Sequence, residues 1–275
     1  MKLKKILPSW AKKLYRAIAK NMPSAKKKAL AKSEELAERV KKTNSILNNL
    51  YDGSVITVLN GPFKGLAYIA LSNGSQLFPK LIGSYEEPIH KWIYEIVEKG
   101  EYKSIIDVGC AEGYYAIGFS KAKSRPRIFA FDIDKDAIKN AKNLAEINGV
   151  SDAVSFYDLF EPSAVSALLK TDISNKTLIF MDVEGAELDL LNTAEAPDIL
   201  NCDILVELHD CFYPGLTEKI IERFQDTHLI EIVVDYPWRL GDYFLNGKIF
   251  GEGDRHYMFN ELRPKAMRWM YARKK

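Results

Sequence analysis

The sequence predicts an α/β protein built around a doubly wound, mostly parallel sheet. Short apolar runs alternate with amphipathic segments of helical length, which is the pattern of strand–helix–strand units. Several apolar runs also carry or precede an acidic residue, and the carboxyl ends of parallel strands meet at one edge of a sheet. The sequence therefore predicts five strands that deliver acids to a common edge. The first begins at Ile105 and ends in an acid, and the others span residues 127–132, 153–157, 177–182 and 203–208, with a sixth strand before Tyr236.

The first strand leads into the most informative turn of the chain. Residues 105–115 predict a buried strand that turns through small residues into a helix over residues 114–121. Gly109 and Gly113 have no Cβ, so the backbone can approach a ligand closely there. A dinucleotide-binding turn needs the spacing G-x-G-x-x-G, but Tyr114 stands where its last glycine would be. The turn therefore favours a nucleotide-like cofactor other than a dinucleotide.

The same residues resemble a known family. An acid two residues before Gly109, followed by G-x-A-x-G, resembles the first motif of class I S-adenosylmethionine-dependent methyltransferases, with Ala111 in place of the commoner glycine. Residues 181–191 closely resemble the D-V-E-G-A-E signature of FkbM-type methyltransferases, and blocks at 61–66, 79–86 and 257–264 extend the likeness over about residues 61–264. The resemblance implies a Rossmann-like seven-stranded doubly wound sheet, mostly parallel with the last strand antiparallel, together with N-terminal helices and a β-hairpin.

The resemblance implies S-adenosyl-L-methionine as the cofactor. Asp107 would orient its ammonium group. Asp132 lies one strand–helix–strand step later, where an acid can accept both ribose hydroxyl hydrogen bonds, and Asp134 is already available as the N-cap of the helix over residues 135–148. Asp158 and its neighbour would lie against the adenine. The residues expected at the cofactor are Asp107, Gly109, Cys110, Ala111, Gly113, Tyr114, Asp132, Ile133, Asp158, Leu159 and Asp182.

The fourth and fifth strands end in the residues expected to be catalytic: Asp182, Glu207 and His209. A histidine is a usable base near neutral pH, so His209, positioned by Glu207 or Asp210, would remove the proton from the acceptor hydroxyl with Asp182 near the reacting centre. These four residues could instead hold a hard divalent cation, although their spacing shows no tight metal pattern. The general base is therefore favoured over a metal. Glu187 is interpreted as a first-turn acid favoured by the helix dipole.

The acceptor is expected to present a hydroxyl group. Methyltransferases that act on exocyclic amines typically carry an Asn/Asp-Pro-Pro-aromatic tetrad at the fourth strand end, and this sequence has none there. The FkbM-type resemblance implies O-methylation of a glycan, polysaccharide precursor or small metabolite. Residues 236–253 predict an aromatic-rich loop that suits stacking on a sugar or aromatic acceptor, or an oligomer contact. Two other functions stay open: an RNA methyltransferase and a non-catalytic cofactor-binding scaffold.

Charge separates the first 50 residues from the rest of the chain. They carry a net charge of +11, whereas the whole chain carries +2. An amphipathic helix around Trp10 and a second one beginning near Ser24 are predicted. This arm could pack on the catalytic domain or a partner subunit, lie on an anionic membrane surface, or bind nucleic acid, in that order of preference. The predicted organisation is a basic helical arm (1–50), a β-hairpin from residues 55–59 and 66–70 within a pre-domain segment (51–90), a methyltransferase domain (91–264) and a basic tail (265–275).

Composition places the chain among cytoplasmic proteins, with contact at the membrane surface left open. The apolar stretch at Ile6 is cut by Pro8 and is too short for a signal peptide or a membrane span. Cys110, Cys202 and Cys211 form no metal or disulfide pattern, which predicts reduced thiols.

Overall fold

The chain divides into two compact units. A computed structural model describes residues 23–172, 176–236, 239, 241–263 and 265–275, and the units are Met1–Ser54 and Val55–Lys275. In the first unit, α2 (Pro23–Tyr51) is one helix of 29 residues that contains the second predicted amphipathic segment. The helix predicted around Trp10 falls outside the described residues. No helix within the described part of the chain combines the length and apolar character that crossing a bilayer requires.

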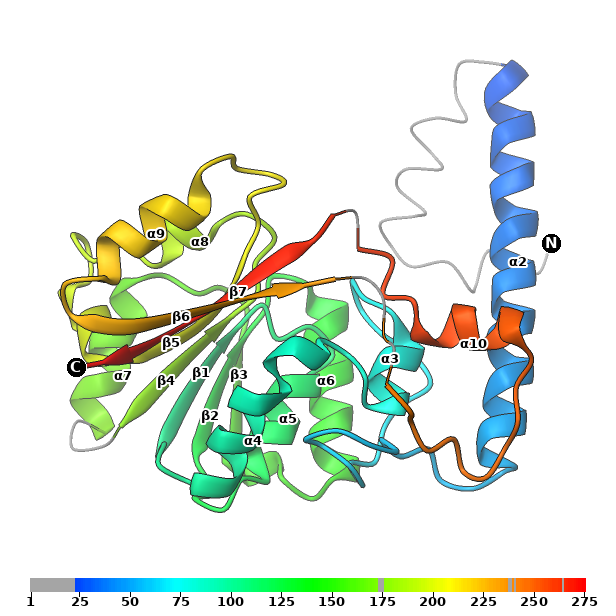
Figure 1. The fold of residues 1–275 in the computed structure, drawn as a ribbon, viewed down its shortest axis with the longest axis horizontal. Coiled ribbons are helices and arrows are strands. Elements are labelled where there is room, and N and C mark those ends of the chain that lie inside the picture. The colour runs from blue at the N-terminus through cyan, green and yellow to red at the C-terminus, as the bar shows by residue number, and fades with distance from the viewer. Residues whose placement is uncertain (1–22, 173–175, 237–238, 240, 264) are drawn as a thin grey trace. The chain divides into compact units, whose positions relative to one another are not determined.

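The second unit is organised around a seven-stranded sheet (Figure 1). Its strand order is β3-β2-β1-β4-β5-β7-β6. The pairs among β1 to β5 are parallel, whereas β7 is antiparallel to both β5 and β6. The predicted Rossmann-like doubly wound fold is confirmed. The strands are β1 (Ser104–Val108), β2 (Arg127–Phe131), β3 (Val154–Tyr157), β4 (Thr177–Met181), β5 (Asp203–Leu208), β6 (His228–Asp235) and β7 (Met267–Lys274).

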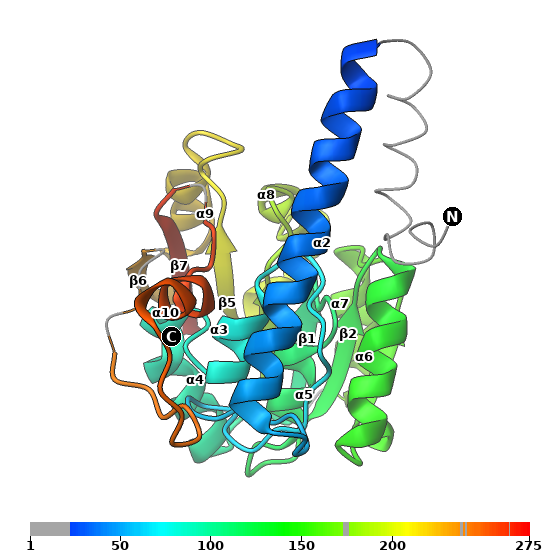
Figure 2. The same ribbon diagram turned by 90° about the vertical axis from the view of Figure 1, so that its right-hand side faces the viewer.

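Helices cover both faces of this sheet (Figures 1 and 2). On one face, Ile106, Ile179 and Ile204 form a buried core with residues of α7 and α9. On the other, Phe180 packs against Phe119 of α5, with ring centroids 5.4 Å apart. The strands can be apolar on both sides because both faces are buried. The helices are α3 (Leu77–Ile82), α4 (His90–Lys99), α5 (Tyr114–Ser120), α6 (Lys135–Ile147), α7 (Ser163–Asp172), α8 (Glu187–Leu190), α9 (Leu216–Phe224) and α10 (Glu252–Phe259), with 3₁₀ turns η2 (Glu87–Ile89), η3 (Ser151–Ala153) and η4 (Pro197–Asn201).

Strand register brings the predicted site residues to one edge. Val108 pairs with Met181, and Met181 pairs with Val206. The residues that follow these positions therefore emerge side by side at the carboxyl ends of β1, β4 and β5, which is where ligands bind in such sheets.

The predicted β-hairpin forms only a single bridge. Thr57 pairs with Ala67 in antiparallel fashion, and the Val58 N–H donates to the Leu66 carbonyl at 2.9 Å. Neither flank forms a continuous strand. The segment is instead held by other contacts, such as the hydrogen bond from the Leu59 N–H to the Leu81 carbonyl.

The prediction for the C-terminus was wrong. Residues 265–275 were expected to be a basic tail, but they contain β7, which lies between β5 and β6. Residues 257–263, just before this strand, contain the end of α10 and an irregular segment. The buried Trp269 and Met270 anchor β7, while its charged residues pair at the surface, Arg268 with Asp210. Those cationic side chains masked the apolar strand pattern.

Candidate active site

The turn after β1 is held close to the neighbouring strand ends. The backbone N–H groups of Gly109 and Cys110 both donate to the Phe131 carbonyl at the end of β2. Gly109 has a φ of +85°, and a Cβ placed there would lie 1.8 Å from the backbone oxygen of Asp182. Only glycine fits this position. Ala111 also has a positive φ, of 48°, which few residues other than glycine adopt readily.

Asp132 lies beside this turn, as predicted. One carboxylate oxygen accepts a hydrogen bond from the Ala111 N–H at 2.8 Å, and the other accepts from the Asp134 N–H at 2.7 Å. Asp134 is the N-cap of α6, as expected. Burial, partly offset by these two N–H donors, raises the pKa of Asp132.

The next positions along the edge are exposed. The apolar side chains of Ile133 and Leu159, at the ends of β2 and β3, are 79% and 60% exposed. Asp158 is also open to solvent, and its carboxylate lies 3.7 Å from Lys135 Nζ. The contact of these three residues with the cofactor stays a prediction.

Cys110 and Tyr114 contribute little but their backbone to this surface. Both side chains are buried. The ring of Tyr114 packs edge-on against Phe63, with centroids 5.2 Å apart, so it faces away from solvent.

Asp107 is a buried carboxylate without a local partner. Its side chain is 1% exposed, and neither oxygen has a hydrogen-bond partner among the described residues. Burial, together with the carboxylates of Asp132 and Asp182, raises its pKa well above the usual range. A buried acid with free acceptor positions next to a ligand-binding turn suits a cationic or donor group.

Glu112, which was not among the predicted residues, clamps the turn to the pre-domain segment. This fully buried carboxylate accepts hydrogen bonds from Tyr68 Oη at 2.7 Å, Ser72 Oγ at 2.8 Å and the Asn73 N–H at 2.8 Å. It also forms an ion pair with the buried Lys80, at 2.6 Å. Burial acts to raise the pKa of Glu112, but Lys80 and the other donors outweigh it, so the net shift is downward.

His209 is oriented by Glu187, not by the residues that the sequence suggested. The His209 Nδ1 lies 2.5 Å from Glu187 Oε1, and both side chains are almost completely buried. Glu187 is held in turn by the Gly185 N–H, which donates to the same oxygen at 3.0 Å. Because a carboxylate can only accept, Nδ1 carries the proton in this pair. Glu187 does lie in the first turn of α8, as interpreted, but its contact with His209 was not predicted.

The other nitrogen of His209 faces three carboxylates. The distances from Nε2 are 3.6 Å to Asp182 Oδ1, 3.5 Å to Glu184 Oε2 and 3.7 Å to Glu207 Oε2. Burial lowers the pKa of His209, but the Glu187, Asp182 and Glu184 carboxylates outweigh it and raise the pKa overall. The structure thus brings together the three residues that were predicted to be catalytic.

The carboxylates of this group are perturbed by their surroundings. Burial, followed by the charge of Glu86, raises the pKa of Asp182 to about 6. Burial, followed by Asp182, raises the pKa of Glu207 well above its usual range. Such shifts are typical of functional sites.

Asp210 takes no part in this arrangement. Its carboxylate accepts from the Thr217 N–H at 3.2 Å and from Arg268 at 3.1 Å, so the predicted role of Asp210 in positioning His209 is not what the structure shows.

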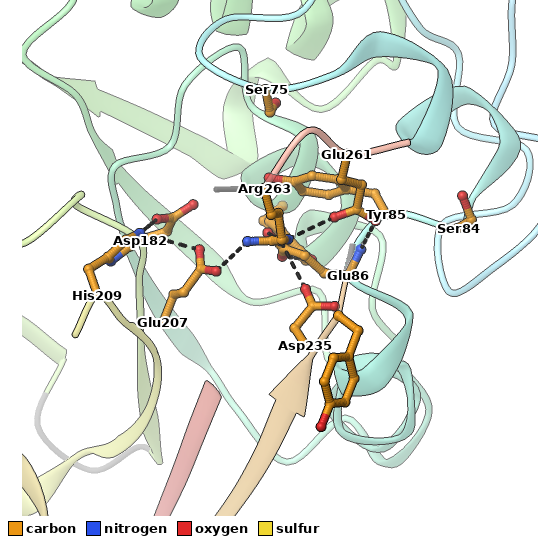
Figure 3. A network of polar contacts seen from close by, with 12 residues as sticks. Ser75, Ser84, Tyr85, Glu86, Asp182, Glu207, His209, Asp235, Glu261 and Arg263 are labelled. Carbon is orange, nitrogen blue, oxygen red and sulfur yellow. Dashed lines mark hydrogen bonds and ion pairs between the residues drawn. The ribbon is translucent and has the colours of Figure 1, made fainter. Parts of the chain in front are cut away.

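Behind the cluster, Arg263 joins several segments in a buried ion-pair network (Figure 3). Its guanidinium pairs with Glu207 from β5, with Glu86 at 2.8 Å, with Asp235 of β6 at 3.0 Å and with Glu261 at 3.1 Å. Glu86 is fully buried in this network.

Arg239 extends the same network. It lies in the loop that was predicted to suit stacking, but it is buried and pairs with Asp235 at 2.9 Å and Glu261 at 2.5 Å. The sequence did not predict the buried ion pairs of Arg263 and Arg239, because nothing in the local sequence pattern separates a buried charge from an exposed one.

Comparison with known proteins agrees with this architecture. Residues 99–181, which run from the end of α4 through β4, match the family model of a methyltransferase domain. The seven-stranded sheet around this segment has the strand arrangement of a Rossmann-like methyltransferase fold. A 67-residue stretch of the chain is 36% identical to the ribosomal protein L11 methyltransferase of Tolumonas auensis, and it covers 24% of this chain. The match spans 22% of that relative's length.

Solved structures of methyltransferases are similar to this chain at low sequence identity. An rRNA methylase from Streptococcus thermophilus is 12% identical, with a TM-score of 0.44 over 68% of this chain and 97% of that one. The human methyltransferase 10 domain-containing protein is 14% identical, with a TM-score of 0.43 over 76% and 87%. An O-methyltransferase from Thermotoga maritima is 13% identical, with a TM-score of 0.39 over 64% and 60%.

Proposed function

We propose that the methyltransferase domain is an S-adenosylmethionine-dependent O-methyltransferase of the FkbM type that modifies a hydroxyl group of a glycan, polysaccharide precursor or small metabolite. The observation that carries the proposal is the position of the Asp182, Glu207 and His209 cluster at the strand ends next to the β1 turn. A cofactor on the turn and an acceptor at the cluster would then be neighbours on the same edge of the sheet.

The turn has the chemistry that S-adenosylmethionine requires. Asp107 offers buried oxygens without a partner to the ammonium end, and Asp132 lies where its carboxylate can accept the ribose hydroxyls. Ile133 and Leu159 present exposed apolar surface that an adenine ring would cover. When bound, the cofactor supplies an electrophilic methyl group.

The chain's own residues would orient the acceptor and activate its oxygen. Methyl transfer is an in-line displacement, so the acceptor must be held behind the methyl group and water must be excluded. A sugar hydroxyl is a weak acid and needs a base or a metal before it attacks well. Phe212, whose ring stacks on His209 with centroids 5.8 Å apart and is 59% exposed, offers a flat face to a sugar or aromatic ring.

Binding and a methyl-transfer screen test this function. Titration calorimetry should detect one saturable S-adenosylmethionine site per chain. A labelled-methyl screen over glycans, hydroxylated metabolites and RNA should then give label only in hydroxyl-bearing acceptors. Label in RNA that is lost on deletion of residues 1–50 would instead support an RNA methyltransferase. Absence of cofactor binding by a folded sample would refute the proposal.

A further inference from the structure

Three ligand-type atoms converge at the carboxyl ends of β4 and β5. Asp182, Glu207 and His209 each contribute one atom, and these atoms all lie within 4.8 Å of one another. Figure 3 shows the three side chains turned toward a common point, with Arg263 on the far side of Glu207. Acidic clusters are common on protein surfaces, so convergence alone does not define a site.

The second observation concerns the imidazole of His209, whose side chain is only 2% exposed. Its Nε2 makes no hydrogen bond among the described residues, because the nearest carboxylate oxygens are 3.5–3.7 Å away, beyond the range of a good N–H···O bond. The Oδ1 atom of Asp182 is also enclosed and has no hydrogen-bond partner among the residues described. A buried nitrogen and a buried oxygen thus face the same point without satisfying each other.

Glu187, which lies outside the cluster, determines which nitrogen of the His209 ring carries the proton. Because Nδ1 donates to Glu187 at 2.5 Å, the neutral imidazole has its lone pair on Nε2. Nε2 is therefore the ring nitrogen left to coordinate a cation placed between the imidazole and the carboxylates. A carboxylate that holds one ring nitrogen while the other faces open ligands is the usual outer shell of a metal-binding histidine.

We propose that Asp182, Glu207 and His209 hold one divalent metal cation of the Mn²⁺ class, with the exposed Glu184 as a further oxygen ligand. Neighbouring ligand atoms around such a cation, at bonds of about 2.1–2.2 Å, lie about 3 Å apart. The observed separations of 3.5–3.7 Å between His209 Nε2 and the carboxylate oxygens therefore need to shorten by about half an ångström. One imidazole nitrogen with carboxylate oxygens suits Mn²⁺, Fe²⁺ or Zn²⁺ better than an all-oxygen Mg²⁺ or Ca²⁺ site.

The ion pairs behind the cluster do not neutralise the negative charge of its carboxylates. Glu207 directs Oε1 to Arg263 and Oε2 to His209, so Arg263 occupies only one side of that carboxylate. Glu86, Asp235 and Glu261 compete for the same guanidinium. The Asp182 carboxylate has no such cationic partner among the described residues other than the imidazole itself, and a bound divalent cation would compensate its charge.

This inference rests on the proposed function only for its role, not for its existence. In an O-methyltransferase, a cation at this place would lower the pKa of a coordinated acceptor hydroxyl, which would take over the task first assigned to His209 as a base. Binding of the cation itself needs neither cofactor nor acceptor, so it can be measured separately.

The test uses the full chain freed of metal with a chelator and titrated with Mn²⁺ alone, with free Mn²⁺ followed by electron paramagnetic resonance. We expect one saturable site per chain. Asp182→Asn and His209→Gln should weaken binding at least about tenfold, which is the lower range for loss of a metal ligand or its support. Asp152→Asn, a matched change at an exposed aspartate, should leave the affinity unchanged. Circular dichroism of each variant verifies the fold.

A second measurement on the unmutated protein keeps the test independent of variant folding. Electron spin echo modulation of bound Mn²⁺ should show coupling to a histidine ¹⁴N. No saturable binding, equal binding by the Asp182→Asn variant, or a bound ion without nitrogen coupling would each overturn the proposal, the last two by showing that the ion is held elsewhere. If Mn²⁺ binds as expected but no acceptor is methylated, the O-methyltransferase function fails and the cation site stands. If the protein binds no Mn²⁺ but still transfers methyl groups after metal removal, the cation site fails and the O-methyltransferase function stands.

Discussion

Glu112→Gln should destabilise the methyltransferase domain more than any change of a surface charge. Glutamine has nearly the same shape, but it removes the charge that faces Lys80 Nζ at 2.6 Å. It also places an amide NH₂ where a carboxylate oxygen now accepts from the Asn73 N–H. The lysine side chain is 4% exposed, so water cannot replace the lost partner.

The expected magnitude follows from these contacts. Breaking a buried ion pair by removing one partner costs about 3–5 kcal/mol, and an unsatisfied buried N–H costs about 1–3 kcal/mol. Because the same loop can relax around both, we expect a total near 4 kcal/mol. Urea unfolding followed by the fluorescence of the buried Trp92 and Trp269 would measure it. Glu98→Gln, which breaks an exposed ion pair to Lys123, is the matched control and should cost less than about 0.5 kcal/mol.

The pH dependence gives this prediction a sign. The pKa of Glu112 in the folded protein is lowered, so its contribution is present above its unfolded value of about 4.3 and is lost as pH falls through the lower folded value. The difference between wild type and Glu112→Gln should therefore be full at pH 7 and shrink below about pH 4. A difference under about 1 kcal/mol at pH 7 would refute the reasoning, since that size belongs to exposed pairs.

Three further predictions concern the turn after β1 and the acids beside it. Gly109→Ala should destabilise the domain by more than about 2 kcal/mol, because the new Cβ would lie 1.8 Å from the Asp182 carbonyl oxygen. Gly149 also has positive φ but open space around it, so Gly149→Ala should cost only about 1 kcal/mol. Equal losses of stability in urea unfolding would contradict this. Asp132→Asn should weaken S-adenosylmethionine binding about 10- to 100-fold by calorimetry, as loss of a charged hydrogen-bond acceptor does, while Asp136→Asn should not; equal affinities would remove the ribose role. Asp107→Asn should stabilise the cofactor-free protein by about 1–3 kcal/mol yet weaken cofactor binding. Because burial raises the pKa of Asp107 in the folded protein, this gain in stability should be larger at pH 8 than at pH 5. A loss of stability at both pH values would show that Asp107 has a partner in the folded state.

Local sequence patterns predicted the parallel half of the sheet and its acidic edge. β5 was predicted residue for residue, and the other parallel strands to within a residue or so at each end. These strands are buried on both faces, so they read as continuous apolar runs. Asp132 and Asp182 could be predicted as site residues because each directly follows the last residue of a strand, and the parallel register places these strand ends at the same edge of the sheet.

The antiparallel part could not be predicted in the same way. β7 inserts between β5 and β6 although it is last in the chain, and its pattern mixes buried apolar residues with arginines that reach solvent. A long cationic side chain can sit on a strand when its charged head pairs at the surface, as Arg273 does with Glu231. Such a segment reads as a charged tail until its partner strands are known.

The residues that organise the site were the hardest to predict because their partners are distant in sequence. Glu187 looks like an ordinary acid near a helix start, and only the folded arrangement brings it to His209, 22 residues away. Glu112 likewise stands among the small residues of the turn, and its role appears only when Lys80 and Asn73 fold over it. Acids that face a ligand can be found from strand ends, whereas acids that hold other side chains in place depend on long-range packing. For this reason the sequence grouped Asp182, Glu207 and His209 but did not identify what holds the imidazole. The contact with Glu187 is what turns Nε2 toward the carboxylates of Asp182, Glu184 and Glu207.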